Sequence, residues 1–192
     1  MGKKFNFFKE AIATAKTSGT LVPSSRFLAE KMLKGINFSD ANLIVELGAG
    51  NGAITKHILQ KIQPNSHLIC FEINELFYNE LLKINHPQLT VLKVSAENII
   101  EEINNRGFTS VDHIVSSLPL SIIPKEVSKK ILKASYSALK NKGTFSQFQY
   151  SLDYFKKMKK IFKKENVTLH FQPLNMPPAF VYKCTKNSTI SS

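Results

Sequence analysis

Three closely spaced glycines follow a short apolar run in the segment Glu46-Leu47-Gly48-Ala49-Gly50-Asn51-Gly52. Glycine lets the backbone turn sharply and approach a ligand that a side chain would exclude. The residues after the segment have a helical pattern, and the N-terminus of a helix offers N–H groups without intrahelical partners. The segment therefore predicts a loop whose backbone binds a small molecule.

Two glutamates accompany this glycine loop. Glu72 ends the next strand-like run, twenty residues after Gly52, where a carboxylate can accept hydrogen bonds from both hydroxyls of a ribose. Glu46 lies two residues before the first glycine, where a carboxylate can pair with an ammonium group. A ligand with both a ribose and an ammonium group satisfies the two positions.

S-adenosylmethionine has both groups, whereas NAD has no ammonium group. The pattern Gly48-x-Gly50-x-x-Ala53 also fits the dinucleotide fingerprint. However, the G-x-G-x-G spacing suits a cofactor without a pyrophosphate. A length of 192 residues also leaves little room for the second nucleotide-binding half and the substrate domain that NAD enzymes usually have. The sequence therefore favours S-adenosylmethionine as the cofactor.

Strand-like and helix-like segments alternate from Leu43 onward, which indicates a parallel sheet built from βαβ units. The expected strands are 43–47, 67–72, 89–94, 111–116, 144–150, 167–171 and 179–184, and the expected helices are 53–62, 75–84, 96–105, 125–140 and 152–164. We expect one α/β domain over residues 1–184, followed by a disordered polar tail over 185–192.

The composition favours an anionic partner and an intracellular protein. Lys and Arg number 26 against 14 Asp and Glu, giving a net charge of +12, which suits nucleic acid or an anionic membrane. Only Arg26 and Arg106 are arginines, and recognition of bases usually recruits arginine. Cys70 and Cys184 lie in strand-like runs and are expected to be reduced core residues, so no metal site is predicted.

Two basic amphipathic segments suggest contact with a membrane surface. Residues 3–16 place Phe5, Phe8 and Ile12 at helical spacing among lysines, and the predicted helix 152–164 is rich in lysine. No window of 18 consecutive apolar residues is present, so a transmembrane helix is not expected. These features predict a cytoplasmic protein that is peripherally bound to the inner membrane face.

The loop, the two glutamates and the alternation resemble the class I S-adenosylmethionine-dependent methyltransferases. This resemblance implies a Rossmann-like fold, with helices on both faces of a seven-stranded, mostly parallel sheet whose last strand is antiparallel. It also implies that Ser95 and Ala96 hold the adenine and that Ser116 belongs to the cofactor site, together with Glu46, Gly48, Gly50, Gly52 and Glu72. A second interpretation of Ser95 is that it caps the following helix.

A narrower resemblance is to the bacterial phospholipid N-methyltransferases, which carry a set of motifs in a fixed order. Here these are the amphipathic residues 3–16, Pro23-Ser24-Ser25-Arg26, Ser116-Ser117-Leu118-Pro119-Leu120, Gln147-Phe148-Gln149-Tyr150 and Asn175-Met176-Pro177-Pro178-Ala179. The resemblance implies N-methylation of an aminophospholipid such as phosphatidylethanolamine, with ornithine lipids as a further candidate. The implied catalytic groups are Ser117 and the Leu118 carbonyl, which accept the amine N–H, and Tyr150, which holds the amine or relays its proton.

Two other functions stay open at this level. The chain also resembles the adenine dimethyltransferases of ribosomal RNA, and its basic surface suits RNA. In those enzymes an aromatic residue stacks on the base where this chain has Leu120, so nucleic acid is the less favoured partner. The remaining alternative is a non-catalytic cofactor-binding module that docks on membranes. The oligomeric state and the number of methyl groups transferred are not predicted.

Overall fold

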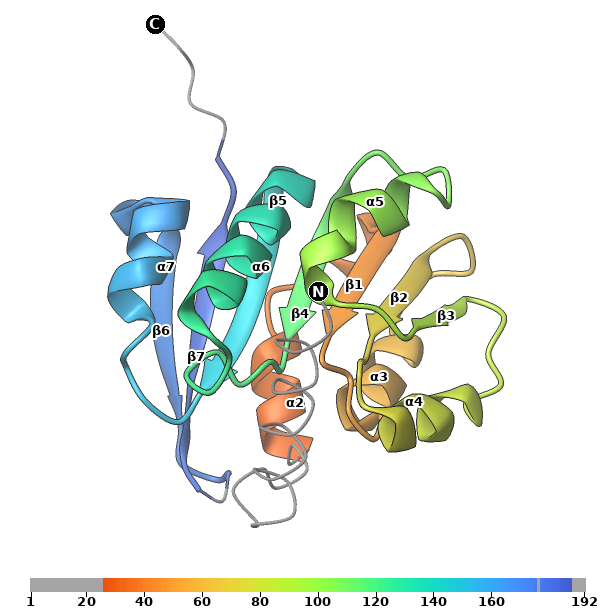
Figure 1. Cartoon of the computed structure of the whole chain (residues 1–192), viewed down its shortest axis with the longest axis horizontal. Helices are drawn as coiled ribbons and strands as arrows, with labels where there is room; N and C mark the ends of the chain where they lie inside the picture. The colour runs from red at the N-terminus through yellow and green to blue at the C-terminus, as the bar shows by residue number, and fades with distance from the viewer. Residues whose placement is uncertain (1–25, 176, 188–192) are drawn as a thin grey trace, which may run out of the picture.

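A computed structural model describes residues 26–175 and 177–187 (Figure 1). The strands are β1 (Leu43–Leu47), β2 (His67–Phe71), β3 (Leu89–Leu92), β4 (Val111–Ser116), β5 (Leu139–Gln149), β6 (Val167–Gln172) and β7 (Ala179–Thr185). The α-helices are α2 (Arg26–Leu33), α3 (Ala53–Leu59), α4 (Glu75–Leu82), α5 (Ile99–Asn104), α6 (Lys125–Ala138) and α7 (Phe155–Phe162). Short 3₁₀ helices span Phe38–Asp40, Ala96–Asn98 and Lys164–Asn166.

The seven strands form one sheet in the order β3-β2-β1-β4-β5-β7-β6. Neighbouring strands from β3 to β5 are parallel, and β7 is antiparallel to both β5 and β6. This confirms the expected fold, including the antiparallel last strand. The strand order reverses between β1 and β4, and α/β sheets bind ligands at the carboxyl ends of the strands beside such a reversal. These ends point to the lower edge of the sheet in Figure 1.

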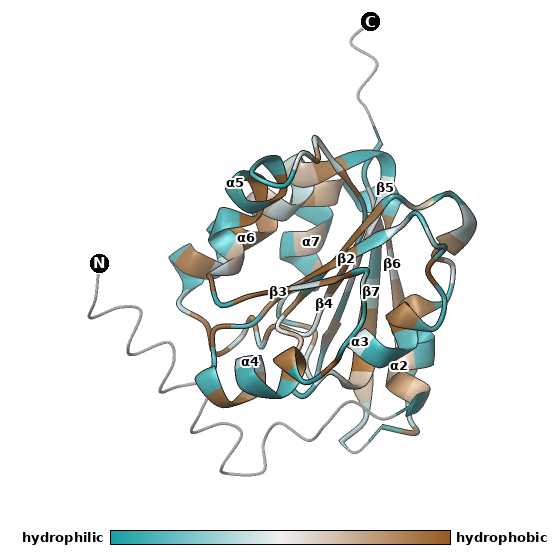
Figure 2. Cartoon of the chain, turned by 90° about the vertical axis from the view of Figure 1, so that its right-hand side faces the viewer, coloured by the Kyte–Doolittle hydropathy of each residue, from teal (hydrophilic) through white to brown (hydrophobic). Residues whose placement is uncertain are grey.

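Apolar side chains cover both faces of the sheet, as a buried parallel sheet requires. Leu43, Val45 and Leu47 face the cluster beneath α5, α6 and α7, whereas Ile44 joins the cluster beneath α2 and α3. Figure 2 shows the apolar strands between helices whose outer surfaces are more polar. Because both clusters pack against β1, the sheet fixes the position of the loop that follows it.

Most predicted elements agree with the structure to within a few residues. β5 begins at Leu139, directly after α6, rather than at 144. The intervening residues accommodate a register shift against β4 between Val111 and His113. The predicted helix 96–105 begins as a 3₁₀ turn, and α7 is shorter than the predicted 152–164.

The prediction of a disordered tail from Thr185 is wrong for its first three residues. Thr185 pairs with Thr144, and the Lys186 N–H donates to the Gly143 carbonyl at 2.9 Å. Asn187 donates to the Asn166 side chain at 2.7 Å. The rest of that tail and the predicted helix 3–16 lie outside the described residues. Across the part of the chain that the structure describes, no helix has the length and apolar content to cross a membrane.

Candidate active site

The glycine loop connects β1 to α3 at the point where the strand order reverses. Gly48 and Gly50 have positive φ angles of 71° and 58°, which side-chain-bearing residues rarely adopt. The Gly48 N–H donates to the Phe71 carbonyl at 2.8 Å, so the end of β2 holds the loop. Gly52 immediately precedes α3, as the sequence pattern predicts.

The same loop lies against the segment between β4 and α6, which we name the acceptor loop (residues 117–124). A Cβ atom on Gly48 would lie 2.8 Å from the Leu118 Cδ2 and 3.4 Å from the Leu118 backbone nitrogen. A side chain at this position would force the Leu118 side chain to shift, and the φ of 71° independently favours glycine. The fold therefore brings the predicted cofactor loop into contact with the predicted methyl-acceptor segment.

Glu72 is placed at the glycine loop by the end of β2. Its side chain is 4% exposed, and its two oxygens accept hydrogen bonds of 2.8 Å from the backbone N–H groups of Gly50 and Asn74. Hydrogen bonds to a carboxylate are among the stronger ones in proteins. Glu72 therefore shapes the loop in addition to its predicted contact with a ribose.

Glu46 is a fully buried carboxyl group beside the loop. Its Oε2 accepts hydrogen bonds from the Thr55 hydroxyl at 2.6 Å and the Cys70 thiol at 3.4 Å, while its Oε1 has no partner among the described residues. Burial raises the pKa of Glu46 to about 7, since desolvation disfavours the charged form. A buried carboxyl oxygen without a partner fits a cationic group such as the ammonium of S-adenosylmethionine.

The remaining predicted cofactor residues lie near the carboxyl ends of β3 and β4. Ser95 accepts a hydrogen bond from the Glu97 N–H at 3.3 Å, so it acts as a helix cap, which was its second interpretation. Ala96 is buried in the next turn. Ser116 is also buried, and its hydroxyl accepts the Leu118 N–H at 3.4 Å. Their predicted contacts with a cofactor stay predictions.

The Leu118 carbonyl is surrounded by donors. The side-chain amides of Gln147 and Gln149 donate to it at 3.0 and 2.9 Å, and the Leu120 N–H donates at 2.8 Å. The predicted role of this carbonyl as acceptor for the substrate amine therefore requires at least one of these donors to move. The more direct consequence is that the two glutamines anchor the acceptor loop to β5.

Ser117 and Tyr150 are the other two predicted catalytic groups. The Ser117 hydroxyl is buried and has no partner within the described chain, so it is free to bond an incoming group. Tyr150 is half-buried, and burial raises the pKa of its phenol, while a hydrogen bond with Asn175 opposes that rise. The structure thus places Ser117 in the acceptor loop and Tyr150 just after β5.

The sequence does not assign roles to four supporting residues. Gln147, Gln149 and Asn175 lie in recognised motifs, but the site groups that they contact, the Leu118 carbonyl and Tyr150, are distant from them in sequence. The sequence signal that could have identified the two glutamines is the alternation of side chains along β5. It places both glutamines on the face of the strand opposite Phe148 and Tyr150. Thr55, which holds Glu46, carried no distinguishing pattern.

The buried carboxyl group predicts a pH-dependent cofactor affinity. If Glu46 pairs with a cation, the ionised form must bind, and the proton must leave a group whose pKa is about 7. The affinity for S-adenosylhomocysteine, which retains the ammonium group, should therefore fall up to about tenfold per pH unit below 7 and level off above it. Calorimetry between pH 6 and 8 measures this.

The variant Glu46→Gln should bind S-adenosylhomocysteine more weakly than the wild type at pH 8, and its affinity should no longer change with pH. Glu101→Gln, on the exposed side of α5, should bind as the wild type does. A wild-type affinity that does not change over this range would exclude the proposed ion pair.

Comparisons with known proteins agree with this geometry. Residues 17–172 match the family described as methyltransferase small domain. The ornithine lipid N-methyltransferase of Singulisphaera acidiphila is 32% identical over 180 residues, covering 93% of this chain and 91% of that protein. The ribosomal RNA small subunit methyltransferase A of Borreliella burgdorferi is 29% identical over 120 residues, covering 62% of this chain and 41% of that protein.

Solved structures show the same fold at low sequence identity. The 1,6-didemethyltoxoflavin-N1-methyltransferase of Burkholderia thailandensis, solved with S-adenosylhomocysteine, has a TM-score of 0.70 and 12% identity. The alignment covers 95% of this chain and 88% of that one. A precorrin-6y C5,15-methyltransferase from Geobacter metallireducens has a TM-score of 0.64 and 14% identity, with coverage of 84% and 88%.

Proposed function

The chain belongs to the methyltransferase small domain family, and we propose that it transfers methyl groups from S-adenosylmethionine to the amine of a membrane lipid. That it is an S-adenosylmethionine-dependent methyltransferase follows from the family and from the relatives. The proposal concerns the acceptor. The headgroups we propose are those of ornithine lipids and phosphatidylethanolamine, which share a primary amine.

One observation carries this proposal: the similarity to a lipid N-methyltransferase extends over nearly the whole of both chains. The similarity to the ribosomal RNA methyltransferase of Borreliella burgdorferi covers less than half of that protein. A relationship along the entire domain includes the acceptor loop and the last strands, where the acceptor must bind. It therefore supports a shared acceptor class more strongly than a partial match does.

The acceptor loop also argues against a nucleobase. Leu120, at the position where the adenine dimethyltransferases stack an aromatic ring on the base, is aliphatic and fully buried. Its carbonyl accepts hydrogen bonds from the Tyr154 hydroxyl at 2.5 Å and the Ser128 hydroxyl at 3.1 Å, which hold it in the core. A flat base would find no stacking platform at this residue.

Exposed aliphatic side chains around the site support membrane contact. Ile122, Leu152 and Leu174 are 38%, 48% and 64% exposed, and we name them the apolar rim. They lie in the loops that follow β4, β5 and β6, at the lower edge of the sheet in Figure 1. Apolar side chains that project from several loops at one edge suit insertion between lipid headgroups.

The chain's residues supply alignment and shielding from water. Bound S-adenosylmethionine carries an electrophilic methyl group on a sulfonium. The glycine loop, Glu72 and Glu46 would hold it, and the acceptor loop packs directly against Gly48. The Ser117 hydroxyl can accept one N–H of a neutral amine, which leaves the nitrogen lone pair free to attack. Tyr150 is a neutral phenol, because burial raises its pKa. It can hold the amine by a hydrogen bond, or relay the amine proton to water by accepting it while giving up its own, and the alignment itself lowers the barrier.

The acceptor can be identified by the destination of a labelled methyl group. The full chain and S-adenosylmethionine labelled in the methyl group are incubated in parallel with four acceptors: ornithine lipid vesicles, phosphatidylethanolamine vesicles, ribosomal RNA and a protein extract. We expect label in one or both lipids and only background in RNA and protein. Label in RNA alone would overturn the proposal, and label in no pool would favour the non-catalytic module.

A further inference from the structure

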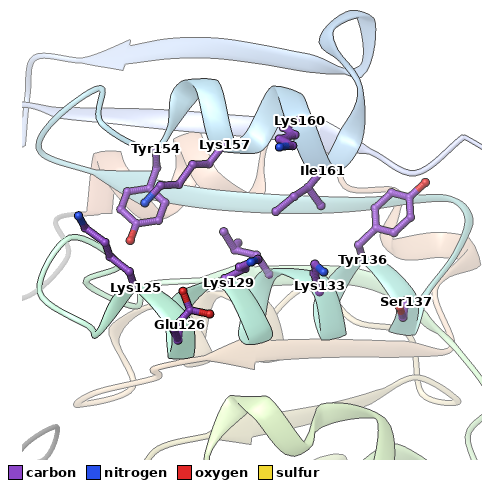
Figure 3. A pocket seen from close by; sticks show the side chains of 11 residues that line it. Lys125, Glu126, Lys129, Lys133, Tyr136, Ser137, Tyr154, Lys157, Lys160 and Ile161 are labelled. Atoms are coloured by element: carbon purple, nitrogen blue, oxygen red, sulfur yellow. The ribbon is translucent and has the colours of Figure 1, made fainter.

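A groove of about 610 Å³ runs between α6 and α7, away from the cofactor loop. The two helices lie side by side on one face of the sheet, and side chains from both enter the groove between them (Figures 1 and 3). None of the predicted site residues lines it. The methyl-transfer chemistry therefore leaves this groove unexplained.

Lysines form both sides of the groove. Lys125, Lys129 and Lys133 follow one another at intervals of four along α6, and Lys157 and Lys160 lie on α7. Residues three or four apart share one face of a helix, so each row of lysines lies along one side of the groove (Figure 3). All five side chains are exposed, and within the described residues none forms an ion pair. Glu126 is the one acidic residue in the lining.

The floor between the lysine rows is apolar. Its aliphatic lining residues are Leu132, which is buried, and Ile161, which is partly buried. Figure 3 shows Tyr154 and Tyr136 at the two ends of the groove. The Tyr154 hydroxyl is bonded to the Leu120 carbonyl, and its ring lies 3.9 Å from the Lys157 ammonium. The Tyr136 ring packs edge-on against Phe162 at 5.2 Å.

We propose that this groove binds one anionic phospholipid of the bilayer, with its phosphate between the lysine rows and part of an acyl chain over Leu132 and Ile161. Lysines that form no ion pair within the described residues, above an aliphatic floor, complement an anionic amphiphile. A single-stranded nucleic acid would need aromatic rings for its bases, and both tyrosines are engaged elsewhere. This site does not depend on which molecule accepts the methyl group.

The groove also adjoins the acceptor loop. Tyr154 joins the end of the groove to Leu120, and Lys125 is the first residue of α6 after that loop. A lipid bound in the groove would therefore keep the acceptor loop, with Ile122 of the apolar rim, close to the bilayer. This position beside the loop suits a lipid that anchors the enzyme while another lipid is methylated.

Methyl NMR of the full chain tests the groove directly. Dihexanoyl phosphatidylglycerol is added below its critical micelle concentration, so that it acts as a single molecule. We expect shifts of the Leu132 and Ile161 methyl signals that saturate with concentration. Glycerophosphoglycerol, the same headgroup without chains, should bind at least about tenfold more weakly because it buries no apolar surface.

Two double variants that reverse the charge of lysines, one in the groove and one away from it, test whether the groove lysines bind the lipid. Lys129→Glu combined with Lys160→Glu should weaken the lipid affinity at least about tenfold. Lys56→Glu combined with Lys61→Glu, the same change in net charge in α3 and just after it, should not. Affinity for S-adenosylhomocysteine and the thermal midpoint confirm that both variants are folded.

Unshifted groove signals, or equal affinities of the two variants, would overturn the lipid site. Saturable shifts of these signals by a single-stranded oligonucleotide, with none from the lipid, would assign the groove to nucleic acid. The labelled-methyl assay reports separately on the acceptor, so failure of the groove and failure of the proposed function are distinguishable.

Discussion

Replacing Gly50 by valine is expected to lower the affinity for S-adenosylhomocysteine by at least about a hundredfold. Gly50 has a φ of 58°, which a β-branched residue adopts only with strain of about 1–3 kcal/mol. Its N–H also donates to Glu72 at 2.8 Å, and a hydrogen bond to a charged group contributes about 1.5–3 kcal/mol. The two losses together amount to about 2.5–6 kcal/mol, and a hundredfold change corresponds to roughly 2.7 kcal/mol, near the lower end of that range.

Gly107→Val is the control for backbone strain, because it introduces valine at a positive φ angle outside the cofactor site. Gly107 has a φ of 80°, and a Cβ atom there would meet nothing within 4 Å. It precedes β4, at the edge of the sheet opposite the glycine loop. This variant should lose a similar amount of stability in thermal unfolding but keep its affinity in calorimetry. Unchanged affinity in Gly50→Val, with the protein folded, would show that the loop is not the cofactor site.

The sequence was sufficient to predict the scaffold of this site. The strands β1 and β2 are mostly apolar and almost wholly buried, because both of their faces are covered. The alternation of strands with helices predicts a parallel sheet, and a parallel sheet brings the loops after β1 and β4 to one edge. Glu46 and Glu72 were identified from their distance to the glycines, and both lie at the loop.

The sequence pattern does not predict the contacts that hold the acceptor loop. The glutamines that bond the Leu118 carbonyl lie 29 and 31 residues away, and only the register of β5 against β4 brings them together. That register includes an irregularity between Val111 and His113, which periodicity does not reveal. The groove between α6 and α7 likewise depends on how the two helices pack. The lysines can be read from the sequence, but the fact that they line one groove cannot.

Glu72 illustrates how a single residue can satisfy two demands. Periodicity and spacing predicted a ribose ligand, but the structure shows both carboxylate oxygens already accepting N–H groups from Gly50 and Asn74. Each carboxylate oxygen has two lone pairs, so these bonds leave capacity for ribose hydroxyls. The residue can therefore shape the loop and bind the ligand at once, and its removal is expected to affect both.

The second large effect is expected at the apolar rim. The triple variant Ile122→Ser, Leu152→Ser and Leu174→Ser removes three exposed aliphatic side chains from the loops beside the site. Burial of a large aliphatic side chain contributes about 1.5–3 kcal/mol when complete, so partial insertion of three contributes about 3 kcal/mol. Vesicle sedimentation with the full chain should then show binding weakened about a hundredfold, and methylation of vesicle lipid should fall with it.

Affinity for S-adenosylhomocysteine should be unchanged in this triple variant, because none of the three residues belongs to the cofactor loop. Leu82→Ser is the control, since Leu82 is 55% exposed but ends α4 and lies outside the three loops that carry the apolar rim. Turnover of a short-chain aminolipid dissolved as monomers should also persist in the triple variant, because a dissolved acceptor needs no membrane contact. Normal vesicle binding by the triple variant would remove the apolar rim from the membrane interface and leave the lysines of α6 and α7 as the contact surface.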